Sequence, residues 1–379
     1  MENSKNKKQN MSFLQTNIFS SQRVPVGLDL SDLSLKLVWI SHGSKWDRIR
    51  SFSSIALAPG VIVDGEIVQE EKVVEAIRKL FAQSGPEKIT SRQVFCSLPE
   101  MKVFLRVIML PRIEKEELAE AVKWEVEGNI PLSLDQIYYD YHILDDELAF
   151  LGNEKQQSVL VVAVARTIVD QYVRVIEKAG LEVVGLETES LAQARIFAPP
   201  PSDPPTTTLI VDLGDRRTSF LISVGNVPLF TSSSHLSAQM FTDILSKTLR
   251  VSFDEAEWLK RQYGIENKSN DNPLQGLLDR ALNDVVSEIE RAMDFYNGSL
   301  NYTPSIDRIL LCGGGSNLLG LVPYLAQRLQ RSVEKGDPWV TLRLGHKIPS
   351  IPFEESSQFS TALGLSLGGI NSSIYASTN

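Results

Sequence analysis

Residues 209–221 read Leu-Ile-Val-Asp-Leu-Gly-Asp-Arg-Arg-Thr-Ser-Phe-Leu, and the rest of the chain is organised around them. A β-branched apolar run meets an acid at Asp212, and then Gly214 and Thr218 precede a return to apolar residues. This order predicts a strand, a tight turn and a second strand. A glycine turn lets backbone N–H groups approach a phosphate, and a carboxylate beside it suits a water-coordinated Mg²⁺. The hairpin is therefore a candidate phosphate and magnesium site.

A second stretch of the chain repeats this pattern. Residues 26–39 read Val-Gly-Leu-Asp-Leu-Ser-Asp-Leu-Ser-Leu-Lys-Leu-Val-Trp. When Asp29 is aligned with Asp212, Ser31 falls on Gly214, and the two stretches lie about half of the chain apart. A repeat at half of the chain length indicates two similar lobes, with two acid-bearing hairpins facing one ligand between them.

Bulk composition excludes several classes of function. The 379 residues carry a formal net charge of −9, which argues against a nucleic-acid-binding protein. Cys96 and Cys312 lie in apolar runs without a metal-binding spacing, and the four histidines form no cluster, so no zinc site is expected. The longest apolar run, residues 159–165, is too short to cross a bilayer, so no transmembrane segment is expected. Residues 1–23 are polar and lysine-rich and are interpreted as a disordered tail, with a weak interfacial helix as the alternative.

The order of the predicted elements divides the chain into lobes. Residues 24–98 predict a first lobe, which residues 183–198 complete. Between these two segments, residues 99–182 show the pattern strand, helix, strand, strand, helix, which predicts an inserted α+β subdomain. Five prolines within residues 199–205 exclude a helix or an inner strand and mark the boundary between the lobes. The second lobe is expected over residues 206–379.

The second lobe contains two further candidate sites. A helical subdomain is predicted over about residues 238–300, and within it Glu257 and Lys260 are spaced to share one face of a helix. The alternative for this pair is a solvated ion pair. A short apolar strand runs into a turn formed by Gly313, Gly314, Gly315 and Ser316. A helix begins after that turn, and a helix N-terminus favours an anion nearby.

Five segments occur in the order found in the actin-like ATP-binding fold, which the sequence resembles. They are the first hairpin, with Lys36 seven residues after Asp29, the second hairpin, the Glu257–Lys260 helix, the glycine turn, and a small-residue helix over residues 359–369. The resemblance implies an α/β, actin-like (ribonuclease H-like) two-lobed fold that binds ATP and Mg²⁺ between its lobes, with Asp29 and Asp212 near the metal. The cofactor-binding residues that it implies are Asp29, Ser31, Asp32, Lys36, Asp212, Gly214, Thr218, Glu257, Lys260, Gly313, Gly314, Gly315 and Ser316.

Short motifs narrow the resemblance to one family. Residues 97–100 read Ser-Leu-Pro-Glu, 106–111 read Arg-Val-Ile-Met-Leu-Pro, 130–132 read Ile-Pro-Leu, 187–192 read Glu-Thr-Glu-Ser-Leu-Ala, and 288–291 read Glu-Ile-Glu-Arg. Over nearly its whole length the chain resembles the type IV pilus assembly protein PilM family, which is related to the cell-division protein FtsA. The resemblance implies a cytoplasmic protein, peripheral to the inner membrane, that binds the N-terminal tail of a PilN-like membrane protein beside the insert. It implies further contacts with platform and motor components of the pilus machine, while self-association stays open.

The first hairpin departs from the family pattern at Ser31 and Asp32, where glycine and serine are usual. Serine tolerates a glycine-like turn less well, and the carboxylate of Asp32 would repel phosphate oxygens. Arg216 and Arg217 of the opposite hairpin are expected to pair with Asp32 or reach the phosphate, and the alternative is that both point to water.

The sequence shows no strong catalytic base. Glu189 and Gln193 are candidates by position alone, so weak or absent hydrolysis is compatible with retained nucleotide binding. Two other functions are alternatives. An FtsA-like membrane tether that forms filaments would need a C-terminal amphipathic helix, but residues 370–379 lack basic residues. A sugar kinase of the same fold would need a substrate-binding acid with its own signature, and none is evident.

Overall fold

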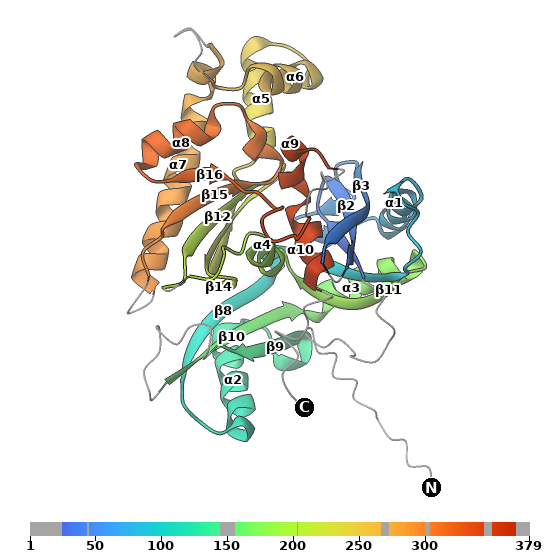
Figure 1. Cartoon of the computed structure of the whole chain (residues 1–379), viewed down its shortest axis with the longest axis vertical. Helices are drawn as coiled ribbons and strands as arrows, with labels where there is room; N and C mark the ends of the chain where they lie inside the picture. Colours follow the sequence, from blue (N-terminus) through green and yellow to red (C-terminus); the bar gives the residue numbers. More distant parts are fainter. Residues whose placement is uncertain are drawn as a thin grey trace.

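Two sheets that share one topology form the centres of the two lobes (Figure 1). In order across the first sheet, the strands are β11 (Glu182–Thr188), β7 (Gln93–Leu98), β1 (Val26–Leu30), β2 (Ser34–His42), β3 (Asp47–Ala56) and β6 (Gly85–Pro86). In order across the second sheet, they are β16 (Val333–Lys335), β15 (Arg308–Cys312), β12 (Thr207–Leu213), β13 (Thr218–Val224) and β14 (Val227–Ser234). Each central hairpin is antiparallel, and two further strands continue parallel to its first strand. The repeated order confirms the two lobes that the paired hairpins predicted.

The computed structural model describes residues 25–43, 45–144, 156–202, 204–266, 273–299, 304–344 and 351–368. The tail expected over residues 1–23 and the C-terminal residues 370–379 lie outside the described residues, as does residue 203 of the proline-rich segment. Within the described ranges, no helix is long and apolar enough to cross a membrane.

Helices cover the sheets with their apolar faces. In the first lobe, α1 (Glu70–Ala82) and α3 (Arg166–Lys178) bury apolar residues at helical spacing in the same core as the first sheet. The helices of the second lobe are α5 (Ala238–Leu249), α6 (Phe253–Tyr263), α7 (Pro273–Ser299) and α8 (Leu321–Leu329). Ser237 and Ser252 cap α5 and α6, because each hydroxyl accepts a bond from an N–H of the first turn.

The inserted segment forms a small sheet of its own. Its strands, in order, are β8 (Val103–Pro111), β10 (Gln156–Ala165) and β9 (Ile137–Ile143). Helix α2 (Lys115–Asn129) covers one face of this sheet with Leu118, Val122 and Val126. Helix α3, which the sequence pattern placed in the insert, lies in the core of the first lobe. We therefore draw the end of the insert at Ala165 instead of residue 182.

The other face of the insert packs on the second lobe. Leu105, Leu160 and Val162 of the insert lie in the same apolar core as Val227 and Leu229 of β14. Figure 1 shows β8 passing beside β14, and the two strands are in contact. The insert thus packs on the second lobe, while Val164 of β10 lies in the apolar core of the first lobe.

Two short helices lie between the two large sheets. They are α4 (Glu189–Ile196) and α10 (Ser360–Gly368), and α10 confirms the small-residue helix predicted near the C-terminus (Figure 1). A Cβ atom added at Gly364 of α10 would lie 2.1 Å from the carbonyl oxygen of Ala192 in α4. A Cβ added at Gly27 of β1 would lie 2.1 Å from the carbonyl oxygen of Ala362. Glycine therefore allows α10 to approach both α4 and the first sheet at backbone distance.

Candidate functional site

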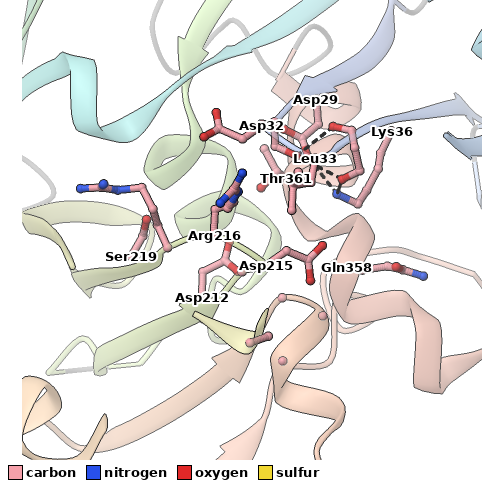
Figure 2. A pocket seen from close by; sticks show the side chains of 18 of the residues that line it. Asp29, Asp32, Leu33, Lys36, Asp212, Asp215, Arg216, Ser219, Gln358 and Thr361 are labelled. Carbon is pink, nitrogen blue, oxygen red and sulfur yellow. Dashed lines mark hydrogen bonds and ion pairs between the residues drawn. The ribbon is translucent and has the colours of Figure 1, made fainter. Parts of the chain in front are cut away.

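A cavity of about 520 Å³ lies between the lobes, and both hairpins line it (Figure 2). The predicted site residues that line it are Asp29, Ser31, Asp32, Lys36, Asp212, Gly214, Glu257, Lys260, Gly313, Gly314 and Gly315. The hairpins, the α6 pair and the glycine turn are far apart in the sequence, so the fold assembles them around one space.

Two predicted site residues, Thr218 and Ser316, do not line this cavity. The buried hydroxyl of Thr218 donates to the carbonyl oxygen of Leu236 at 3.0 Å. The buried hydroxyl of Ser316 donates to the carbonyl oxygen of Gly313 at 2.7 Å. Both hydroxyls therefore stabilise loops that border the site, and we remove them from the set of proposed ligand contacts.

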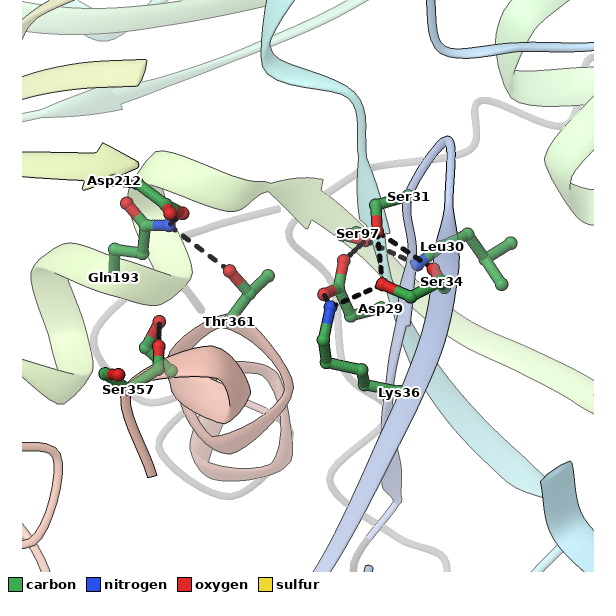
Figure 3. Close-up of polar contacts among 11 residues, drawn as sticks. Asp29, Leu30, Ser31, Ser34, Lys36, Ser97, Gln193, Asp212, Ser357 and Thr361 are labelled. Carbon is green, nitrogen blue, oxygen red and sulfur yellow. Dashed lines mark hydrogen bonds and ion pairs between the residues drawn. The ribbon is translucent and has the colours of Figure 1, made fainter. Parts of the chain in front are cut away.

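The first hairpin holds Asp29 and Lys36 close together (Figure 3). Asp29 accepts a bond from the hydroxyl of Ser97 at 3.1 Å, and the Lys36 ammonium lies 3.8 Å from the Asp29 carboxylate. The Ser31 hydroxyl donates to the carbonyl oxygen of Ser34 at 2.8 Å. Ser31 does not adopt a positive φ, so this turn has no need of glycine and the strain expected there is absent.

The second hairpin places Asp212 against the glycine turn. The Gln193 amide donates to the Asp212 carboxylate and also to the Thr361 hydroxyl, at 3.3 Å (Figure 3). Gly313 has φ +76°, and a Cβ added there would lie 2.2 Å from the Asp212 carboxylate. Glycine is required at this position for both its backbone conformation and its contact. Gln193, a catalytic candidate by position, orients Asp212 in this arrangement.

The environment of Asp212 favours its protonated form. Burial raises the pKa of Asp212 to about 6, and the charges of Asp29 and Asp215 act in the same direction. The Gln193 hydrogen bond and the Lys36 charge oppose this rise in pKa. Among the described residues, no group of three or more metal-ligating side chains is close enough to hold a metal ion directly.

Glu189 and Glu100 extend this carboxyl cluster along the cleft. Burial raises the pKa of Glu189 well above its usual range, and the nearby Asp29 and Asp212 charges raise it further. Burial also raises the pKa of Glu100, which accepts a bond from the Ser190 N–H at 3.1 Å. Glu100 lies in a motif of the sequence, but its contact with Ser190 of α4 and its place in the cavity arise from the tertiary structure.

Without ligand, we expect Asp212 to make folding stability depend on pH. Its pKa is raised in the folded state from 3.8 to about 6, so the stability it contributes is complete below pH 3.8 and is lost as the pH rises through about 6. Asp212→Asn removes this titration. Between about pH 4 and about pH 7, the melting temperature should therefore fall more steeply for the wild type than for the variant. Parallel melting curves across this range would contradict the pKa assigned to Asp212.

Asp32 is bonded to the backbone of a neighbouring turn. Its carboxylate accepts the N–H of Asp64 at 2.9 Å and the N–H of Gly65 at 3.0 Å. Arg217 has its ion pair with Asp64, at 3.5 Å, and contacts His235 Nδ1 at 3.0 Å. Arg217 therefore pairs with Asp64, in the turn that binds Asp32, and does not pair with Asp32 itself.

The predicted helical pair is present on α6 and faces the cavity. The Lys260 ammonium lies 2.6 Å from the Glu257 carboxylate, which also accepts the Thr242 hydroxyl at 2.5 Å. Arg261 contributes a second cation at 2.8 Å from Glu257. The pair is thus a fixed, partly buried group and differs from the solvated ion pair that was the alternative.

Residues outside the predicted motifs also line the cavity. They include Gly65, Met101, Ser357 and Gln358. These residues come from a short turn of the first lobe, the root of the insert and the segment before α10. Their sequence neighbourhoods carry no ligand-binding pattern, so only the tertiary structure reveals them.

Comparisons with known proteins agree with this architecture. The family model described as "Type IV pilus assembly protein PilM" matches residues 27–370. A solved PilM–PilN type IV pilus biogenesis complex superposes with a TM-score of 0.78 and 26% identity, covering 92% of this chain and 99% of that chain. The cell division protein FtsA of Neisseria meningitidis serogroup B is 23% identical over 281 residues, which span 67% of this chain and 66% of that relative.

Two more distant structures share the fold. Ethanolamine utilization protein EutJ of Carboxydothermus hydrogenoformans has a TM-score of 0.56 and 16% identity, over 92% of this chain and 90% of that chain. MreB5 of Spiroplasma citri bound to ADP has a TM-score of 0.52 and 14% identity, over 93% of this chain and 98% of that chain. Together with the repeated sheets, these likenesses confirm the actin-like two-lobed α/β fold.

Proposed function

This chain belongs to the type IV pilus assembly protein PilM family, and from that premise we propose that it is a nucleotide-binding scaffold of a pilus assembly machine. In this proposal the chain binds ATP and Mg²⁺ between its lobes and holds a membrane partner at its insert. The observation that carries the proposal is the interlobe cavity, where two equivalent acid-bearing hairpins meet a glycine turn. Such a space suits a ligand with a flat base at one end and phosphates at the other.

The residues of the cavity fit a magnesium nucleotide. Its volume of about 520 Å³ lies within the range of roughly 300–1,000 Å³ found for small-molecule sites. Asp29 and Asp212 would hold Mg²⁺ through water, and Lys36 would offset phosphate charge. Glu257 and Lys260 would bind the ribose and the base beside the glycine turn. A bound metal ion would offset the negative charge of this carboxyl cluster, in which the charges of Asp29 and Asp212 raise the pKa of Glu189.

We propose that the scaffold acts by binding nucleotide, with slow hydrolysis at most. Gln193 is held between Asp212 and Thr361, so its amide is already engaged. The raised pKa of Glu189 favours a protonated carboxyl group, which is a poor general base. Neither residue is thus arranged as a strong activator of water.

Mg²⁺-ATP is expected to raise the melting temperature of the wild type, because a ligand that binds only the folded state stabilises it. Asp212→Asn should lose most of this increase, because it removes a carboxylate beside the proposed Mg²⁺ position. Asp294→Asn, at an exposed position of α7, serves as the matched control and should respond like the wild type. Equal ligand-induced shifts in both variants would place the nucleotide elsewhere.

The proposed partner is the N-terminal tail of a PilN-like membrane protein, docked at the insert. The complex of PilM with PilN among the similar structures supports this choice of partner. Through that tail the chain would lie at the cytoplasmic face of the inner membrane, with access to other platform and motor components. We consider two positions for the tail: the outer edge of β9, which pairs only with β10 among the described strands, or the junction between the insert and the first lobe.

Each candidate position has contacts that substitutions can test. The N–H of Leu144 donates to the carbonyl oxygen of Ser158 in β10. In an antiparallel ladder every second residue points its N–H toward the same neighbour, so the N–H of Tyr139, five residues earlier, points away from β10 and toward the outer edge. An extended peptide could add to that edge. At the junction, the Arg166 guanidinium lies 4.0 Å from the Tyr138 ring, and the Tyr138 hydroxyl donates to Asp170 at 3.3 Å.

Three variants distinguish these positions when binding of the synthetic tail is measured by fluorescence anisotropy. Tyr139→Pro removes the outward N–H and should abolish binding at the edge, whereas Tyr139→Ala removes only the side chain and should retain it. Tyr138→Ala should instead weaken binding at the junction. If all three variants bind the tail like the wild type, the insert is not the docking site.

A further inference from the structure

The side chain of Asp32 is fixed at the tip of the first hairpin. Its two oxygens accept the N–H groups of Asp64 and Gly65, at 2.9 and 3.0 Å. The buried Tyr172 hydroxyl donates to the Gly65 carbonyl oxygen at 3.1 Å and so anchors the same turn to α3. The carboxylate of Asp32 cannot swing away from a ligand without breaking two charge-assisted bonds.

Asp32 lies where the interlobe cavity adjoins a second cavity. It lines the interlobe cavity and also this second cavity, of about 470 Å³, which lies beyond the hairpin tips. Arg216 of the opposite hairpin lines both cavities as well and extends toward the same space (Figure 2). Among the described residues that line the second cavity, none belongs to the glycine turn or to α6. Asp32 and Arg216 therefore mark the place where one cavity passes into the other.

This position determines which part of a bound nucleotide Asp32 would meet. If the base lies beside Gly313 and Lys260, the phosphates extend toward the hairpin tips, and the last phosphate comes nearest to Asp32. Lys36 is already engaged with Asp29 and Ser34, at 3.8 and 2.8 Å. A fixed carboxylate repels an added phosphate charge, and this repulsion is strong where water is partly excluded.

We propose that Asp32 makes the cleft discriminate against a third phosphate, so that the protein binds a nucleoside diphosphate at least as tightly as the triphosphate. The proposal rests on the proposed nucleotide-binding function and names the ligand class which that site prefers. In this proposal Asp32 is a specificity-determining residue. Its charge makes the affinity depend on the number of phosphates and has little effect on recognition of the base.

The test is calorimetric titration of the full chain with ADP and with ATP, each at the same free Mg²⁺ concentration and again in EDTA. The wild type should bind ADP at least as tightly as ATP. Asp32→Asn keeps one oxygen acceptor for the turn but removes the charge, and it should raise the ratio of ATP affinity to ADP affinity by about tenfold. The effect should be larger in EDTA, where no metal ion neutralises the phosphates.

Asp64→Asn is the matched control. It removes the same charge from the neighbouring turn, but Asp64 lines only the second cavity. Asparagine also tolerates the left-handed backbone of this position, where φ is +50°. The affinity ratio of this variant should stay within about twofold of the wild-type ratio, because the Asp64 carboxylate is paired with Arg217, at 3.5 Å, and does not line the interlobe cavity.

Several outcomes would overturn the proposal. The proposal is wrong if the wild type binds ATP tenfold or more tightly than ADP. This measurement needs no variant, so it still decides the question if Asp32→Asn does not fold. If Asp32→Asn lowers the ATP affinity in the presence of Mg²⁺ but not in EDTA, the Asp32 carboxylate binds the cation, and the proposed repulsion is wrong. If neither nucleotide binds the wild type, the proposed function itself fails. If both bind and the ratio is insensitive to Asp32, only the discrimination is wrong.

Discussion

Gly364→Ala is expected to lower the free energy of unfolding by about 3 kcal/mol or more. The added Cβ would lie 2.1 Å from the carbonyl oxygen of Ala192, and the next nearest atoms are the carbonyl carbon and Cα of the same residue. These atoms belong to the backbone of α4, so no side-chain rotation can relieve the overlap. Either α4 or α10 must shift, and both helices pack between the two large sheets. Urea denaturation measures the loss.

Gly276→Ala in α7 provides the matched control for Gly364→Ala. A Cβ added at Gly276 meets nothing within 4 Å, and alanine favours a helix more than glycine does. The control substitution should therefore raise the free energy of unfolding by about 0.5–1 kcal/mol. A cost below about 1 kcal/mol for Gly364→Ala would mean that the two helices do not meet at backbone distance.

Arg195→Met is expected to cost about 3–5 kcal/mol, because it leaves a buried carboxylate without its cation. The Glu187 side chain is only 2% exposed, and its two oxygens accept the two terminal nitrogens of Arg195, at 2.5 and 2.8 Å. Arg195 also donates to the carbonyl oxygen of Gly364 at 2.8 Å, so it joins α4 to α10. Methionine keeps much of the apolar stem but none of these bonds.

A double-variant cycle separates the loss of the pair from the loss of the α10 contact. Glu187→Gln combined with Arg195→Met removes both charges, so most of the cost of the single Arg195→Met variant should be recovered. The part that is not recovered measures the bond to Gly364. If the double variant is as unstable as the sum of the two single variants, the side chains do not form the buried pair described here.

The fold and much of the site were predictable because their signals are local. A β-branched run, an acid and a short turn define each hairpin within about a dozen residues, and the pattern occurs twice. The positions of Asp29 and Asp212 in the cleft follow from that repeat. The Glu257–Lys260 pair follows from helical spacing alone, which places both side chains on one face.

Other parts of the site depended on contacts that sequence spacing does not encode. The hydroxyls of Thr218 and Ser316 have the right residue type and position but donate to carbonyl groups of their own lobe. The sequence suggested an arginine partner for Asp32, but its carboxylate accepts two backbone N–H groups of a turn more than thirty residues away. Helix α3 continues the insert in sequence, but its apolar face matches the first sheet. Glu100, which precedes the insert strand β8, lines the cleft and accepts the N–H of Ser190 in α4, a contact that sequence spacing does not reveal.

The packing of the insert limits how this segment could be moved or removed. Helix α2 covers one face of its sheet, and the side chains of Leu105, Leu160 and Val162 on the sheet complete an apolar core that β14 shares. Excised, the segment would carry that apolar face into water, which favours aggregation. A chain without it would in turn expose β14. The insert is therefore not a module that can be transplanted, and its gain or loss in a lineage would require matching changes in a lobe that lies far from it in the sequence.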